Sequence, residues 1–315
     1  MQPAISIVIP AFNAEATLPD LVQDCVSQTL KDIEVICVDD GSDDGTLACI
    51  KELSRHHANV RALSICHAGP TAARSAGARE ACGDWIIFAD ADDRVESTWI
   101  ESLVTGGHQV DPYGKADIIA GANCWDRTCT DSDEVKMEQK RIWSVSKGLF
   151  PCGSQMNEIW KRMLGGRENA VTISHSMCDK LFRTEFARNI FKGIDRSIRI
   201  GEDTCFNISA FARAQAVAVT YATGYRWTDT KNSLSYTPPL CALQDNRVVY
   251  AYVKNELLAH GYGECGATLW KDWMNRLTEN QLRILCGDTK IAERLAARFM
   301  ASYEEAALEL IQSER

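Results

Sequence analysis

The sequence of 315 residues has no apolar run long enough to cross a lipid bilayer, which takes about 20 consecutive residues. Its N-terminal stretch, MQPAISIVIPAFN, has no basic segment before the apolar run, and that run predicts a short strand. We therefore expect neither a signal peptide nor a membrane-spanning helix.

Paired cysteines of the kind that bind zinc or exchange thiols are also missing, because none of the 13 cysteines stands in a CxxC pair. Many of them, such as Cys37, Cys66 and Cys205, lie in apolar stretches, where a free cysteine behaves as a small hydrophobic residue. This pattern is typical of a reduced, cytoplasmic protein.

Positive charge is scarce as well. The chain has 34 Lys and Arg against 43 Asp and Glu, which gives a net charge of −9. General nucleic-acid-binding proteins carry an excess of basic residues, so we expect no nucleic-acid partner. The hydrophobic content of 45% is ordinary for a globular protein, and the length is sufficient for one or two domains.

The first hundred or so residues alternate between short β-prone runs and segments with helical spacing of apolar residues. The predicted strands cover 5–9, 33–38, 60–66 and 85–89, and the predicted helices cover 17–29, 47–56 and 71–82. This order implies an α/β fold with a mostly parallel, doubly wound (Rossmann-like) sheet. Right-handed crossovers would place the C-terminal ends of the first, second and fourth strands at one edge.

The pattern is looser beyond residue 95, although regular elements are still expected. Helices are predicted at 99–104, 155–164, 177–189 and 202–214, strands at 117–122 and 216–221, loops at 106–115 and 228–239, and a hairpin or irregular insertion at 123–150. Three further helices, at 240–259, 266–286 and 289–313, form a C-terminal helical extension.

Two carboxylate clusters follow strands at the same predicted edge of the sheet. Asp39 and Asp40 end the second strand, and Asp90, Asp92 and Asp93 follow the fourth. Ligands of open α/β sheets bind at this edge, and carboxylates there suit a hard divalent cation or the N–H and O–H donors of a nucleoside. The simpler interpretation of either cluster is a solvated acidic turn.

Two common nucleotide-binding motifs are absent from the first strand and the loop that follows it. Pro10-Ala11-Phe12-Asn13 stands where a GxGxxG dinucleotide fingerprint would be, and no Walker A lysine motif follows. The two commonest nucleotide-binding alternatives for this layout of the sheet are therefore excluded.

Five motifs between Ser6 and Asp93 together resemble the family 2 glycosyltransferases with the GT-A fold. They are SIVIPAFN (6–13), SQT (27–29), EVICVDDGSDDGT (34–46), GPTAAR (69–74) and GDWIIFADADD (83–93). Thinner similarity continues at KLFR (180–183), GED (201–203), YR (225–226) and SLS (233–235). The resemblance implies a GT-A domain over 1–238, with a donor half at 1–122 and an acceptor half at 123–238, before a helical region at 239–315.

The resemblance also implies roles for individual residues. Those expected to line the nucleoside and donor pocket are Pro10, Ala11, Phe12, Asn13, Glu15, Asp40, Arg74, Asp90, Ala91 and Arg226. Asp90-Ala91-Asp92 matches the DXD motif of the family, with Asp92 as the ligand of Mn²⁺ or Mg²⁺ and Asp90 as a ribose or sugar contact.

Asp203, next to Glu202, resembles the catalytic base of the inverting family members. Both acidic residues also stand at the start of a predicted helix, where the helix dipole favours negative charge, so a purely structural role is the alternative. A single carboxylate of this kind fits a single displacement in which it accepts the proton of the attacking hydroxyl.

The expected function is an inverting transfer of a hexose-type sugar from a nucleoside-diphosphate sugar, with UDP as the expected nucleotide. The expected acceptor is a glycan or a lipid-linked sugar in bacterial surface polysaccharide or lipopolysaccharide synthesis. Peripheral association with the inner face of the cell membrane and the oligomeric state stay open. The alternatives are a non-catalytic GT-A-like module that binds a sugar nucleotide or glycan, and, less favoured, a nucleotidyltransferase.

Overall fold

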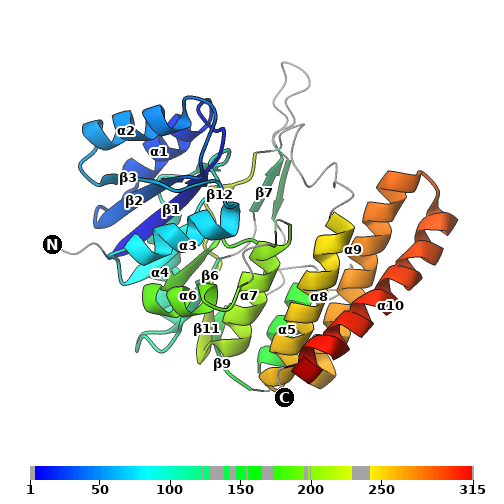
Figure 1. The fold of residues 1–315 in the computed structure, drawn as a ribbon. Helices are drawn as coiled ribbons and strands as arrows, with labels where there is room; N and C mark the ends of the chain where they lie inside the picture. Colours follow the sequence, from blue (N-terminus) through cyan, green and yellow to red (C-terminus); the bar gives the residue numbers. More distant parts are fainter. Residues whose placement is uncertain are drawn as a thin grey trace.

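The computed structural model describes residues 4–121, 124–127, 138–141, 147–153, 155–164, 173–194, 198, 200–228 and 242–313. Within these residues the chain folds into a central sheet covered by helices on both faces, with a group of long helices at one side (Figure 1). The predicted loop at 228–239 lies outside the described residues, except for Thr228.

The central sheet is mostly parallel and has eight strands in the order β3-β2-β1-β4-β10-β6-β11-β9. Only β10 and β9 run antiparallel to their neighbours in it. Its strands are β1 (Ile5–Ala11), β2 (Ile33–Asp39), β3 (Val60–Ser64), β4 (Trp85–Phe88), β6 (Ile118–Ala120), β9 (Gly148–Pro151), β10 (Lys180–Arg183) and β11 (Ala216–Val219). Two separate ribbons pair β5 (Arg94–Val95) with β12 (Tyr225–Arg226), and β7 (Cys124–Arg127) with β8 (Glu138–Arg141).

The helices cover both faces of this sheet, which explains why its first two strands are buried along nearly their whole length. The N-terminal helices are α1 (Leu18–Val26), α2 (Thr46–His56), α3 (Pro70–Glu80) and α4 (Trp99–Val110). Those that follow are α5 (Met156–Leu164), α6 (Thr184–Phe191) and α7 (Glu202–Arg213). One hydrophobic core lies under α1, α2 and α4, and the other lies under α3, α6 and α7.

Two predicted elements differ from the structure. Residues 180–183, predicted to be helical, form strand β10, because Leu181 and Phe182 are fully buried in the sheet between β4 and β6. The helix predicted at 99–104 continues to Val110 through Gly107, whose missing side chain lets the helix approach the sheet. A Cβ atom on Gly107 would lie 2.6 Å from the Cδ1 atom of Ile119.

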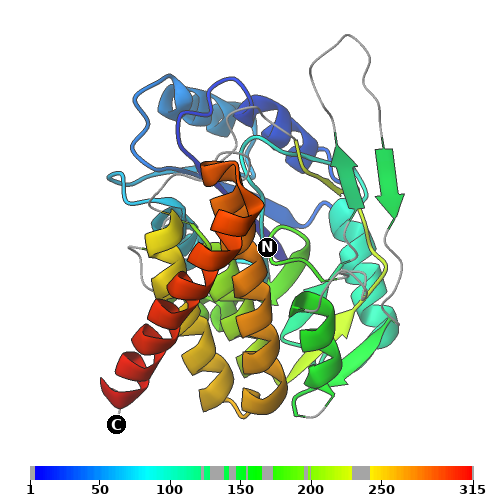
Figure 2. The same ribbon diagram turned by 90° about the vertical axis from the view of Figure 1, so that its right-hand side faces the viewer.

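The C-terminal part of the chain folds into α8 (Ala242–Ala259), the short π-helical turn η1 (Gly263–Ala267), α9 (Thr268–Cys286) and α10 (Thr289–Ser313). The three long helices lie side by side (Figure 2). Helix α8 packs against α7, where Arg213 forms two hydrogen bonds with the Glu256 carboxylate, of 2.6 and 2.8 Å. Among the described helices, none combines the length and the apolar character needed to cross a bilayer.

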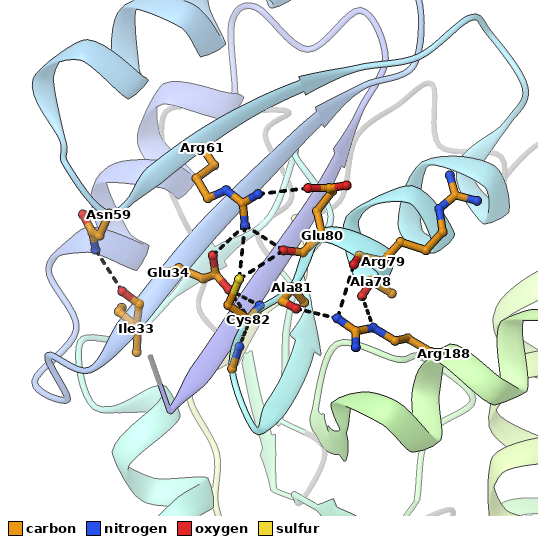
Figure 3. A network of polar contacts seen from close by, with 12 residues as sticks. Ile33, Glu34, Asn59, Arg61, Ala78, Arg79, Glu80, Ala81, Cys82 and Arg188 are labelled. Atoms are coloured by element: carbon orange, nitrogen blue, oxygen red, sulfur yellow. Dashed lines mark hydrogen bonds and ion pairs between the residues drawn. The ribbon is translucent and has the colours of Figure 1, made fainter. Parts of the chain in front are cut away.

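A polar network at the N-terminal end of the strands fixes the end of α3 (Figure 3). The buried Glu34 carboxylate accepts hydrogen bonds from the Ser6 hydroxyl at 2.6 Å, the Cys82 amide at 2.6 Å and Arg61 at 3.0 Å. Arg188 of α6 donates hydrogen bonds to the backbone carbonyls of Ala78, Arg79 and Ala81 at the end of α3. These contacts set the position of α3, whose opposite half carries Arg74.

Candidate active site

The acidic turn after β4 gives its three aspartates three different surroundings. Asp90 is about one-third exposed, Asp92 is exposed and Asp93 is buried. The Asp93 amide donates a hydrogen bond to the Asp90 carbonyl at 3.0 Å, which closes the turn. The turn follows β4, and β4 and β2 both pair in parallel with β1. The three aspartates therefore lie at the edge of the sheet where β1, β2 and β4 end, as predicted.

Arg74 joins this turn to the start of α7. Its Nη2 atom lies 2.7 Å from Asp90 Oδ1, and its Nη1 atom lies 3.0 Å from Glu202 Oε1 and 2.9 Å from Asp203 Oδ1. The Arg74 side chain is only 5% exposed, so these interactions form largely out of water. Carboxylates separated by more than a hundred residues thus share one guanidinium, which brings the predicted donor contact and the predicted base into one cluster.

The Asp203 carboxyl has surroundings that shift its pKa towards neutral pH. Burial raises its pKa to about 7, with further contributions from Glu202 and Asp90, against the opposing effect of Arg74. The buried Oδ1 atom forms an ion pair with Arg74 but receives no hydrogen bond within the described residues. Gly201, at φ +88°, precedes α7 in a conformation that favours glycine, and so places both acidic residues in the first turn of the helix.

Within the described part of the chain, the Asp92 carboxylate forms no hydrogen bond or ion pair with another residue, and only its own backbone amide donates to it. Although the side chain reaches solvent, the surrounding protein atoms and the charge of Asp90 raise its pKa. Oxygen ligands suit Mg²⁺ and Mn²⁺, and Mg²⁺ is commonly held by one or two carboxylates together with phosphate oxygens. Asp92 therefore fits such an ion. The described residues contain no ready-made group of three or more His, Cys, Asp or Glu for a metal.

Asp40, predicted to line the nucleoside pocket, is buried, and its carboxylate forms hydrogen bonds with neighbouring residues of the chain. Its Oδ1 and Oδ2 atoms accept hydrogen bonds of 2.9 Å from the amides of Ala68 and Gly69, and its Oδ2 atom lies 3.1 Å from His67 Nδ1. The Asp40 carboxylate therefore holds the loop between β3 and α3 in place beside the predicted pocket.

The loop after β1 is fastened to the loop after β2. Pro10 and Ala11 end β1, and Asn13, at φ +52°, accepts a hydrogen bond from the Asp43 amide at 2.9 Å. The Glu15 carboxylate accepts one from the Gly45 amide at 2.7 Å. A Cβ atom on Gly45 would lie 2.3 Å from that carboxylate, so a larger residue there would displace the Glu15 side chain from this contact.

Phe12 and His67 form an exposed pair of rings between these loops. The ring centroids lie 4.4 Å apart at an interplanar angle of 31°, and the Phe12 residue is 45% exposed. Exposed rings of this kind offer a surface on which a planar base can stack. The sequence analysis named Phe12 for the donor pocket but not His67.

Two residues missed by the sequence analysis contact the acidic turn directly. The Tyr225 hydroxyl accepts a hydrogen bond from the Asp90 amide at 2.9 Å, and the buried Cys178 thiol donates to Asp90 Oδ2 at 3.6 Å. Tyr225 stands in the YR motif, in which the sequence analysis gave a role only to Arg226. Arg226 pairs with Glu96 at 2.9 Å on the β5–β12 ribbon. Cys178 stands in no motif, so the sequence offered no signal for it.

Several known proteins are similar to this chain in sequence or in fold. Residues 6–109 match the family model described as glycosyl transferase family 2. Residues 6–109 are therefore of the family 2 glycosyltransferase type. It is 27% identical over 276 residues to a cholesterol galactosyltransferase of Borreliella burgdorferi, an alignment that covers 83% of this chain and 70% of the relative. The succinoglycan biosynthesis protein ExoO of Rhizobium meliloti is 25% identical, with 74% of this chain and 63% of the relative covered.

Solved structures of TarS from S. aureus share the fold. TarS 1–349 in complex with UDP superimposes with a TM-score of 0.61 at 15% identity, covering 98% of this chain and 91% of that chain. The complex of the same protein with UDP-GlcNAc gives a TM-score of 0.54 at 14% identity, with 98% and 92% covered. The predicted GT-A-type α/β fold with C-terminal helices is confirmed, and the matching domain together with the relatives identifies a glycosyltransferase.

Replacing Arg74 by methionine should leave three clustered carboxylates without their shared cation. We expect the free energy of unfolding to fall by about 3–5 kcal/mol near neutral pH, as when one partner of a buried ion pair is removed. Unpaired carboxyls gain a higher pKa in the folded protein than in the unfolded chain, so the loss should shrink as the pH is lowered towards about 5. Denaturant titrations at several pH values measure both effects.

Arg79→Met is the matched control, because Arg79 lies on the same helix with an exposed side chain. Its free energy of unfolding should stay within about 0.5 kcal/mol of the wild type. Equal losses in the two variants would show that Arg74 does not compensate the buried carboxylates.

Proposed function

We propose that this glycosyltransferase moves a hexose-type sugar from a UDP-sugar to a glycan or lipid-linked acceptor of the bacterial surface, with inversion at the transferred carbon. The observation that carries the proposal is the Arg74 cluster, which places the acidic turn next to the Asp203 carboxyl. The relatives and fold neighbours support these substrate classes, because they include a galactosyltransferase, a succinoglycan biosynthesis protein and TarS in complex with UDP and with UDP-GlcNAc. We further propose that residues 1–238 form the catalytic domain and 239–315 a helical region packed against it.

The donor would bind at the edge of the sheet where β1, β2 and β4 end. In this proposal the Phe12–His67 pair stacks on the base, and the loops held by Asp40 and Glu15 shape the nucleoside pocket. Asp92, with Asp90 beside it, would hold Mn²⁺ or Mg²⁺. Such an ion, when bound, neutralises charge that develops on the departing diphosphate.

The base would be Asp203. An acceptor hydroxyl attacks the anomeric carbon from the face opposite the diphosphate, and the new C–O bond forms as the bond to the phosphate oxygen breaks. The hydroxyl proton passes to the Asp203 carboxylate, and the nucleoside diphosphate leaves with the bonding electron pair. Arg74 opposes the effect of burial on the Asp203 pKa and so keeps a useful fraction of this carboxyl ionised at neutral pH.

Changing Asp203 to asparagine should lower kcat by about 10²- to 10⁴-fold, because the amide cannot accept the proton. Donor binding, measured by calorimetry, should remain within a few-fold of the wild type. In the wild type, the rate should rise as the pH increases through about 7, since only the ionised Asp203 acts as a base. Steady-state kinetics with a panel of sugar nucleotides and acceptors provide these values.

Asp272→Asn removes an exposed carboxylate from α9 and is the control for this change. It should leave both kcat and the pH profile unchanged. An Asp203→Asn enzyme with wild-type turnover would exclude Asp203 as the base.

Asp92→Asn should abolish most of the metal-dependent part of donor binding. A ligand present at a hundred times its Kd stabilises a folded protein by about 2.7 kcal/mol, which a thermal shift detects easily. We expect UDP with Mn²⁺ to raise the Tm of the wild type more than UDP alone, and this difference to disappear in Asp92→Asn. A wild-type Tm that responds to no nucleotide, with or without metal, would contradict the proposed function.

A further inference from the structure

The third aspartate of the acidic turn, Asp93, is turned into the protein. It is 4% exposed, and both of its carboxylate oxygens accept hydrogen bonds from the segment that contains β12. The Tyr225 hydroxyl donates to Oδ2 at 2.6 Å, and the Thr228 amide donates to Oδ1 at 2.7 Å. Asp93 is therefore engaged in holding the turn against β12.

The Tyr225 hydroxyl forms hydrogen bonds with both ends of the turn. It donates to Asp93 and accepts the hydrogen bond of the Asp90 amide at 2.9 Å, so that one oxygen atom is bonded to the residues on each side of the Ala91-Asp92 pair. The Tyr225 ring is itself fixed. It is 3% exposed and contacts Trp99 and Trp227, at ring centroid distances of 5.5 and 5.2 Å.

The backbone supports the same arrangement. The turn runs directly into β5, and β5 pairs with β12 so that Val95 lies opposite Tyr225. The Glu96 amide donates to the Gly224 carbonyl at 2.7 Å. Gly224, at φ +128°, packs on Trp99, and a Cβ atom there would lie 3.0 Å from the Trp99 Cα atom. The backbone pairing of β5 with β12 and the packing against Trp99 therefore fix the position of the Tyr225 hydroxyl next to the turn.

We propose that Tyr225 and Asp93 are positioning residues for the donor-side cation. By fixing the two ends of the turn, they keep the Asp92 carboxylate directed outward and available. This inference rests on the proposed function, because it assumes that Asp92 meets a divalent ion. Groups that orient a metal ligand commonly change metal affinity by about 10- to 100-fold when they are removed.

Tyr225→Phe is the sharpest test, because it keeps the buried ring and removes only the hydroxyl. UDP binding is measured by calorimetry across a series of Mn²⁺ concentrations. We expect the half-saturating Mn²⁺ concentration to rise about tenfold, while UDP binding without metal stays within about twofold of the wild type. Hydrogen exchange should also become faster at the Asp90 amide, which loses its acceptor.

Tyr303→Phe is the matched control, since it removes a buried tyrosine hydroxyl in the C-terminal helices that bonds to the Leu243 carbonyl. Its Mn²⁺ dependence should equal that of the wild type. Asp93→Asn provides a second variant if Tyr225→Phe fails to fold. The asparagine amide has only one oxygen to accept the hydrogen bonds of the Tyr225 hydroxyl and the Thr228 amide. The half-saturating Mn²⁺ concentration is therefore expected to rise in this variant as well.

The outcomes separate the inference from the proposed function. Unchanged Mn²⁺ dependence in a folded Tyr225→Phe protein, together with unchanged exchange at Asp90, would overturn the positioning role while leaving the proposed function intact. A wild-type protein that binds UDP without any response to metal would overturn the metal role of Asp92, and the positioning role with it.

Discussion

One buried guanidinium sets the geometry of the site. Arg74 is almost fully removed from water, and burying its charge is unfavourable unless carboxylates surround it. It meets Asp90 on one side and Glu202 with Asp203 on the other, so it ties the end of β4 to the start of α7. The position of Arg74 depends in turn on α3, whose far end is held by Arg188 and by the Glu34 network (Figure 3).

The acidic turn shows how neighbouring residues of one type acquire different chemistry. Asp90 is bonded to Arg74 and Cys178, and Asp93 is bonded to Tyr225 and Thr228. Burial and the nearby Asp90 raise the pKa of Asp93 to about 8, against the opposing effect of the hydrogen bonds that its carboxylate accepts from Tyr225 and Thr228. Asp92 between them is directed to solvent, and the division of roles among the three follows from these surroundings rather than from the aspartate side chain itself.

The sequence predicted the parallel half of the sheet well, because its strands are short β-branched runs separated by helices with clear periodicity. The C-terminal helices were predicted for the same reason. Residues 180–183 were predicted wrongly, since their pairing with β4 and β6 depends on strands about sixty to a hundred residues away. The edge position of Asp90 and Asp92 follows from topology. The contacts of Arg74 with Glu202 and of Tyr225 with Asp93 span more than a hundred residues and leave no local pattern.

A double-mutant cycle between Arg74 and Asp203 tests the shared charge most directly. The free energy of unfolding is measured near pH 8 for the wild type, Arg74→Met, Asp203→Asn and the double variant. If Arg74 compensates the Asp203 carboxylate, Asp203→Asn should change the free energy of unfolding more favourably in the Arg74→Met protein than in the wild type, with a coupling of about 0.5–3 kcal/mol. An equal effect of Asp203→Asn in both backgrounds would show that the two residues do not interact and that Arg74 does not compensate the charge of Asp203.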